Sequence, residues 1–146
     1  MSRTLVTVGY EGRGIDDFVA CLKKYAIDCL LDVREVPLSR KPGFSKTKLA
    51  RRLNKENILY VHFKELGSPK PLRQKLKENR DYAAFFKKMN EYLADKTKVL
   101  QNAYEFIANK TCCLMCFEHR AESCHRKIVA EQLKKLDGNG LKIKNI

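Results

Sequence analysis

Short apolar runs alternate along this chain with stretches in which apolar residues recur every three or four positions. Apolar runs of this length, bounded by turn residues, predict strands that are buried on both faces, as in a parallel sheet. The runs that predict strands are residues 5–8, 28–33, 58–62, 111–117 and, at the end of the chain, 141–146. The sequence therefore predicts a sheet whose strands are separated by helices.

The intervening stretches have helical spacing, and several begin at a residue suited to capping a helix. We expect Ser45 to cap a helix over 46–55, and Ser123 to cap a helix that ends before Gly138 and Gly140. The other predicted helices are 15–26, 81–93 and 99–107, with a short helix over 72–77 inside an irregular excursion over 63–80. The alternation predicts an α/β fold, a single compact domain over residues 1–146 with a mainly parallel central sheet flanked by helices.

Ionisable side chains follow four of the predicted strands. In a parallel sheet, functional sites form in the crevice at the carboxyl ends of the strands. The residues at these ends are, strand by strand, Tyr10 and Glu11; Asp32, Arg34 and Arg40; His62; and Cys116 with Glu118. We therefore predict one polar cleft at this edge of the sheet.

The segment Ser123-Cys124-His125-Arg126 carries the most distinctive local chemistry. If Ser123 caps the helix, the next three residues fill its first turn, where cations oppose the helix dipole. A compensating anion is then expected, either Glu118 or Glu122 or a bound phosphate, sulfate or carboxylate. A thiol in such a setting has a lowered pKa and is nucleophilic at neutral pH.

The chain contains six cysteines, and a domain of this size in a reducing compartment is expected to keep them reduced. Cys21 and Cys29 lie among apolar residues and are predicted to pack in the core. Cys113-x-x-Cys116 followed by Cys124-His125 offers soft zinc ligands. Strand alternation, however, places Cys113 and Cys116 on opposite faces. We predict no metal and no cofactor.

The net charge of the chain indicates which kinds of partner it attracts. Thirty basic residues against seventeen acidic ones give a net charge of +13, which attracts nucleic acid or phosphorylated small molecules. The basic helix over 46–55 is either a solvated face or a guide for such a polyanion. No apolar run approaches the roughly 20 residues of a membrane span, and no leader precedes the first strand, so we expect a cytoplasmic protein without membrane contact.

Ordered motifs along nearly the whole chain resemble the family called domain of unknown function 488. They are Thr7-Val8-Gly9-Tyr10-Glu11, Leu31-Asp32-Val33-Arg34, Pro37, Ser39, Gly43-Phe44-Ser45, Tyr60, His62, Glu65-Leu66-Gly67, Cys116-x-Glu118 and Cys124-His125-Arg126. The resemblance implies a compact α/β domain and supplies no activity. Leu31-Asp32-Val33-Arg34 also looks like the strand opening of rhodanese-type sulfurtransferases, over four residues only.

These observations lead to three hypotheses. The first is an enzyme acting on an anionic substrate, with Cys116 or Cys124 as nucleophile or redox thiol and with Glu118, His125 or Asp32 completing the catalytic set. Its predicted substrate-binding residues are Tyr10, Glu11, Arg34, Arg40, His62 and Arg126. The second is a nucleic-acid-binding module without catalysis, and the third is a partner-binding domain whose polar rim only holds loops. The substrate, the reaction and the oligomeric state are not predicted.

Overall fold

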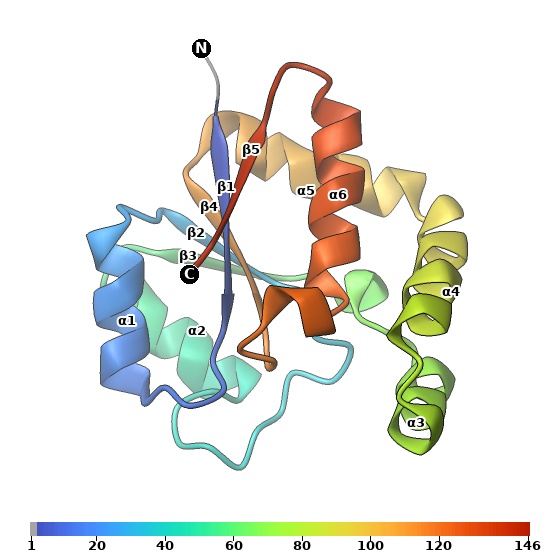
Figure 1. Cartoon of the computed structure of the whole chain (residues 1–146). Helices are drawn as coiled ribbons and strands as arrows, with labels where there is room; N and C mark the ends of the chain where they lie inside the picture. The colour runs from blue at the N-terminus through green and yellow to red at the C-terminus, as the bar shows by residue number, and fades with distance from the viewer. Residues whose placement is uncertain (1–2) are drawn as a thin grey trace.

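The computed structural model describes residues 3–146, apart from the side chain of residue 122. Within this part of the chain, five strands form one sheet in the order β3-β2-β4-β1-β5, and every neighbouring pair is parallel (Figure 1). The strands are β1 Thr4–Gly9, β2 Cys29–Asp32, β3 Leu59–His62, β4 Cys112–Cys116 and β5 Lys142–Asn145. The predicted fold class and each predicted strand are confirmed.

Helices cover both faces of the sheet. α1 (Ile15–Lys24) and α2 (Lys46–Asn54) pack on one face, and α5 (Thr97–Asn109) and α6 (Arg126–Asp137) pack on the other. α3 (Lys70–Asn79) and α4 (Tyr82–Ala94) form a hairpin that stands beside the sheet (Figure 1). None of the described helices is long and apolar enough to cross a bilayer.

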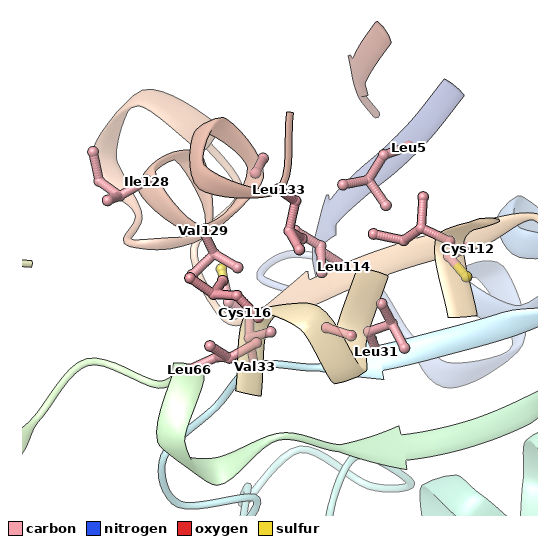
Figure 2. Packing of buried hydrophobic residues seen from close by; sticks show 14 of the residues in the cluster. Leu5, Leu31, Val33, Leu66, Cys112, Leu114, Cys116, Ile128, Val129 and Leu133 are labelled. Atoms are coloured by element: carbon pink, nitrogen blue, oxygen red, sulfur yellow. The ribbon is translucent and has the colours of Figure 1, made fainter. Parts of the chain in front are cut away.

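Alternate residues of the strands enter two separate cores, because successive strand side chains point to opposite faces. Leu5, Leu31 and Leu114 pack against α5 and α6 (Figure 2). Val6 and Leu30 pack against α1 and α2. Both faces of the central strands are therefore apolar, which explains why they appear as continuous apolar runs in the sequence.

Three local expectations were wrong in detail. The excursion over 63–80 contains a ten-residue helix, α3, where a shorter one was predicted, because Pro69 and Pro71 fit its beginning. Ser45 stands at the start of α2, but its hydroxyl bonds to Ser39 instead of capping the helix.

The third correction concerns the predicted Ser123 cap. Ser123 ends a short 3₁₀ helix (Ala121–Ser123), Cys124 is extended, and α6 begins at Arg126. The tight turn reverses the chain soon after β4. Cys124 is thereby returned to the end of β4, which a helix starting at Ser123 would not achieve.

The topology opens a crevice between the carboxyl ends of β1 and β4. β1 leads into α1 on one face of the sheet, whereas its neighbour β4 leads into α6 on the opposite face. Such a switch point is where ligands bind in open α/β sheets. Gly9 lies at this point, and a Cβ there would lie 1.6 Å from the carbonyl oxygen of Glu118. Only glycine therefore lets the loop after β4 close over the end of β1.

Candidate thiol site

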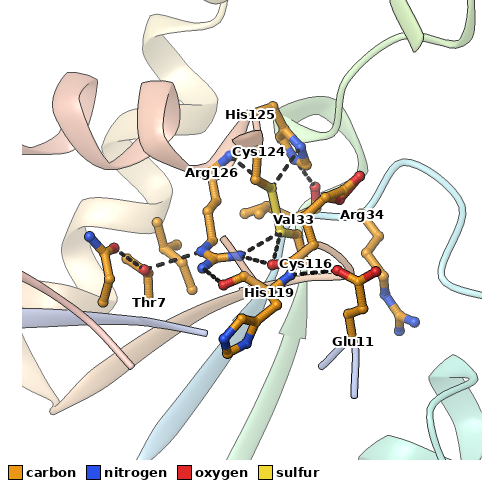
Figure 3. The surroundings of a disulfide bond; sticks show 12 residues. Thr7, Glu11, Val33, Arg34, Cys116, His119, Cys124, His125 and Arg126 are labelled. Atoms are coloured by element: carbon orange, nitrogen blue, oxygen red, sulfur yellow. Dashed lines mark hydrogen bonds between the residues drawn. A yellow bond between two sulfur atoms is a disulfide. The ribbon is translucent and has the colours of Figure 1, made fainter. Parts of the chain in front are cut away.

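Cys116 and Cys124 meet at the mouth of this crevice. Cys116 is the last residue of β4 and Cys124 follows the 3₁₀ turn, and their sulfur atoms form a disulfide (Figure 3). The expectation that every cysteine is reduced is wrong for this pair. Cys21, Cys29, Cys112 and Cys113 are free thiols.

The guanidinium of Arg126 lies against the sulfur of Cys116. Arg126 is fully buried, and its Nη1 is 3.1 Å from Cys116 Sγ. Its Nε donates to Thr7 Oγ1 at 3.2 Å, and its remaining N–H groups donate to the carbonyls of Glu118 and His119 (Figure 3). These neighbours hold the cation in place from three sides. A fixed positive charge at this distance stabilises the thiolate form of Cys116 when the disulfide is reduced.

The imidazole of His125 faces the other sulfur. His125 Nε2 is 2.7 Å from the backbone oxygen of Val33, and His125 Nδ1 is 3.6 Å from Cys124 Sγ. A carbonyl only accepts hydrogen bonds, so Nε2 carries the proton and Nδ1 presents its lone pair to Cys124. Burial lowers the pKa of His125 to about 4, and the nearby Arg126 adds to the effect. The ring is therefore neutral near pH 7, with the Nδ1 lone pair facing Cys124 Sγ.

A cavity of about 340 Å³ opens beside the two sulfur atoms. It is lined by groups from separate elements, among them Tyr10, Arg34, Ser68, Arg73, Glu118 and His125. Phe117 stands at its rim with 47% of its surface exposed. The volume is at the lower end of the range for small-molecule sites.

Arg34 is held by Asp32, with which it forms a two-pronged ion pair. Arg34 Nε is 2.9 Å from Asp32 Oδ1 and Nη2 is 2.7 Å from Oδ2, while Nη1 donates to the Tyr10 hydroxyl. Burial alone would lower the pKa of Arg34, but the hydrogen bonds and charge of Asp32 raise it above its ordinary value. Arg34 thus stays charged at the cavity wall. Asp32 is fully buried behind it, where it positions the arginine.

Glu118 lies at the rim of the cavity. Desolvation by the surrounding loops raises its pKa, and the negative charge of Glu11 raises it further. A carboxyl group with a raised pKa is better suited to proton transfer than an ordinary carboxylate. Glu11 itself accepts the backbone N–H of His119 at 3.1 Å and lines a neighbouring hollow instead of the thiol cavity.

The side chains around the disulfide include a group of atoms that could ligate a metal ion. Ligand atoms of Cys116, Glu118 and Cys124 all lie within 4.8 Å of one another, so the reduced pair and this carboxylate are the residues that would hold a metal ion. The Arg126 guanidinium against Cys116 repels a cation at that position. As predicted, Cys113 and Cys116 face opposite cores. The arrangement fits thiol chemistry better than metal chemistry.

The remaining predicted site residues lie away from the sulfur pair. His62 Nε2 is 2.7 Å from the backbone oxygen of Arg34, and its ring borders a hollow near Lys46. Arg40 is exposed in the loop that leads to α2. Arg73, from α3, was not predicted, yet it lines the thiol cavity and pairs with Glu35 at 2.8 Å. Its position carried no signal, since it falls in a stretch of polar residues with weak helical periodicity.

Comparisons with known proteins yield one match. The model of the family described as "Domain of unknown function DUF488" matches residues 14–133, which is most of the chain and includes Cys116 and Cys124. No curated protein and no solved structure matches the chain.

Proposed function

This chain belongs to the family described as Domain of unknown function DUF488, a description that names no activity, and we propose that it is an enzyme with a redox-active thiol pair, Cys116 and Cys124. One observation carries the proposal. The two sulfur atoms meet beside an open cavity, with the Arg126 guanidinium on one sulfur and a neutral imidazole on the other. Structural disulfides have no need of a base and a cation at their sulfurs, whereas reactive thiols do.

In the proposed cycle, the reduced pair cleaves a disulfide bond of the substrate. The Cys116 thiolate, stabilised by Arg126, attacks one sulfur, and the other leaves as a thiolate that takes a proton from Glu118. Cys124 then gives its proton to His125 Nδ1, and its sulfur attacks Cys116 Sγ. This displaces the second substrate thiolate, which receives the proton from His125. Two electrons have passed to the substrate, and a small dithiol restores the pair.

The charges around the cavity favour an anionic substrate. Arg34 and Arg73 line it, and the chain carries a net charge of +13. Both arginines already pair with carboxylates, so they orient an anion and do not bind it alone. Arg126 is fully buried behind the sulfurs, and its proposed role is to stabilise Cys116.

A redox titration read by mass spectrometry tests the proposal. The protein is equilibrated in buffers of reduced and oxidised dithiothreitol, free thiols are alkylated, and the modified cysteines are identified. We expect Cys116 and Cys124 to change state together in one reversible two-electron transition. The enzyme-dependent part of the dithiothreitol-driven reduction of an aliphatic disulfide, measured above the uncatalysed rate, should be lost in Cys116→Ser and Cys124→Ser.

Cys21→Ser is the matched control, because Cys21 is a half-buried free thiol on α1. This variant should keep full activity. Full activity in Cys116→Ser, or a pair that never forms the disulfide in solution, would overturn the proposal.

A further inference from the structure

A row of cations on α3 runs toward the thiol pair. Arg73, Lys77 and Arg80 are spaced four and three residues apart, which puts them on one side of the helix. All three line a second hollow of about 310 Å³. This hollow shares a wall with the thiol cavity, because Cys124 and His125 line both. A ligand that lies along α3 therefore reaches the reacting sulfurs.

Two of these cations are available to a ligand. Lys77 and Arg80 are exposed, and neither has an ion-pair partner among the described residues. Arg80 ends α3 in the left-handed conformation (φ 56°), at a position that glycine usually fills. An arginine here costs backbone energy and places a positive charge at the hollow. Neither position contributes to the core, since α3 has no buried residue.

The cations continue past the thiol pair on its other side. A third hollow of about 700 Å³ is lined by Arg13 and Arg120, and also by the carboxylates of Glu11 and Glu118. The Nε of Arg13 is buried and has no hydrogen-bond partner among the described groups. Glu118 lines all three hollows and so marks the point where they join. Together they form one groove, which we call the basic groove.

The length of the basic groove sets the kind of anion that fits. From Arg73 to Arg80 the helix rises about 10 Å, which is longer than a single phosphate needs, and the cations of the third hollow extend the row. Two aromatic side chains border the same path, the half-exposed Phe117 and the partly buried Tyr82. A row of cations beside partly exposed aromatic rings is the arrangement that binds single-stranded nucleic acid, whose bases stack on such rings.

We propose that the basic groove, which passes beside Cys116 and Cys124, binds single-stranded nucleic acid. The phosphates lie along Lys77 and Arg80, and a base stacks on Phe117. A duplex does not fit this arrangement, because its bases are already stacked and paired. The inference concerns binding and goes beyond the proposed function, since nucleic acid contains no disulfide for the thiol pair to reduce.

Binding is measured by fluorescence anisotropy with labelled twelve-nucleotide oligo(U) and oligo(dT) at several salt concentrations. In Lys77→Ala/Arg80→Ala we expect at least a tenfold loss of affinity at low salt. The slope of log affinity against log salt should become shallower by about 1.4, since each cation on a single strand contributes about 0.7. Phe117→Ala should weaken binding severalfold and leave the slope unchanged.

The matched control is Lys48→Ala/Lys55→Ala, which removes the same charge from exposed positions on and just after α2. This variant should bind like the unaltered protein. Equal losses in both double variants would mean general charge attraction, and tripolyphosphate that competes as well as the oligonucleotide would mean a small phosphorylated ligand. Either result overturns the inference.

The proposed redox function and the proposed nucleic-acid binding can be tested independently of each other. The oligonucleotide is tested on the Cys116→Ser/Cys124→Ser protein, and the redox titration is repeated on Lys77→Ala/Arg80→Ala. Binding without a reversible thiol transition would leave a nucleic-acid-binding module without catalysis and sink the proposed function. A reversible transition without oligonucleotide binding would sink the inference alone.

Discussion

Two pairs of cysteines lie at opposite ends of β4. Cys112 begins the strand and lies opposite Cys29 of β2, whereas Cys116 ends the strand and is bonded to Cys124. Burial does not distinguish the pairs, because their exposed fractions are 0% for Cys29, 1% for Cys112, 2% for Cys116 and 3% for Cys124. All four belong to the same apolar cluster. The pairs differ in their neighbours and in the cavity beside only one of them.

At the amino end of β4 the thiols are packed in the core. The hydrogen bond between Cys112 and Cys29 raises the pKa of Cys112 and lowers the pKa of Cys29, while burial opposes ionisation of both. Burial also raises the pKa of Cys113. At the carboxyl end, the Arg126 guanidinium lies 3.1 Å from Cys116 Sγ and the His125 imidazole lies 3.6 Å from Cys124 Sγ. A parallel sheet places its loops with functional groups at the carboxyl ends, so we expect this strand to carry inert thiols at one end and reactive ones at the other.

The largest expected effect is the difference in labelling between the two pairs. After reduction, we expect iodoacetamide to modify Cys116 and Cys124 at pH 7 at least about a thousandfold faster than Cys29 and Cys112. The core thiols react only when the fold opens, which costs several kcal/mol. Peptide mapping of quenched samples measures each rate. If Cys112 is labelled as fast as Cys116, the comparison is wrong.

The second prediction concerns the loss of stability at low pH that is caused by His125. Its pKa is about 4 in the folded protein, against an ordinary value of 6.5 for the unfolded chain. The unfolded chain binds a proton more readily over this range, so protons favour unfolding. The contribution of neutral His125 to the free energy of unfolding is fully present above about pH 6.5 and is lost as pH falls toward 4. The loss is about 3 kcal/mol for this group, measured by urea unfolding at each pH.

His125→Gln provides the comparison for that measurement. The glutamine amide can still donate to Val33, but it has no group that titrates between pH 4 and 6.5. The variant should therefore lose about 3 kcal/mol less stability on acidification than the unaltered protein. Identical acid sensitivity in the two proteins would show that His125 is not held neutral.

The strands and most helices could be predicted because each depends on a local pattern. The apolar run over 28–33 contains β2, and the spacing over 81–93 contains most of α4. The start of α6 could not be predicted, because Ser123 is a good local cap and is overridden by the tertiary turn that returns Cys124 to β4. The helix α3 was underestimated because it has no buried face to produce a clear period.

The third prediction tests the cation at Cys116. In Arg126→Lys we expect alkylation of Cys116 at pH 7 to slow by about tenfold, because a single ammonium group cannot keep the same contacts to the sulfur and the carbonyls. The pH profile of labelling should move to higher pH, which loss of packing alone would not cause. Arg73→Lys, a change in the other wall of the cavity, should leave the profile where it is.

The candidate site was predictable in its members but not in their roles. The carboxyl ends of the strands pointed to Cys116, Cys124, His125 and Arg34, and these lie around one cavity. Their pairing could not be read from the sequence, because it depends on how the eight-residue segment after β4 folds back. His62 was expected at the cleft, but its ring is bound to a backbone oxygen beyond the end of β2.

The smallest expected effect is at the inert pair. Cys112→Ala removes a buried sulfur atom and its hydrogen bond with Cys29, and we expect it to lower the free energy of unfolding by about 1 kcal/mol. The labelling rate and redox transition of Cys116 and Cys124 should not change, although Cys112 lies on the same strand. Unfolding in urea and the alkylation assay measure the two quantities on one sample. A change in the labelling rate of Cys116 would mean that the two ends of β4 are coupled through the core. The two cysteine pairs would then differ in how reactive they are, and no longer as an inert pair and a reactive pair.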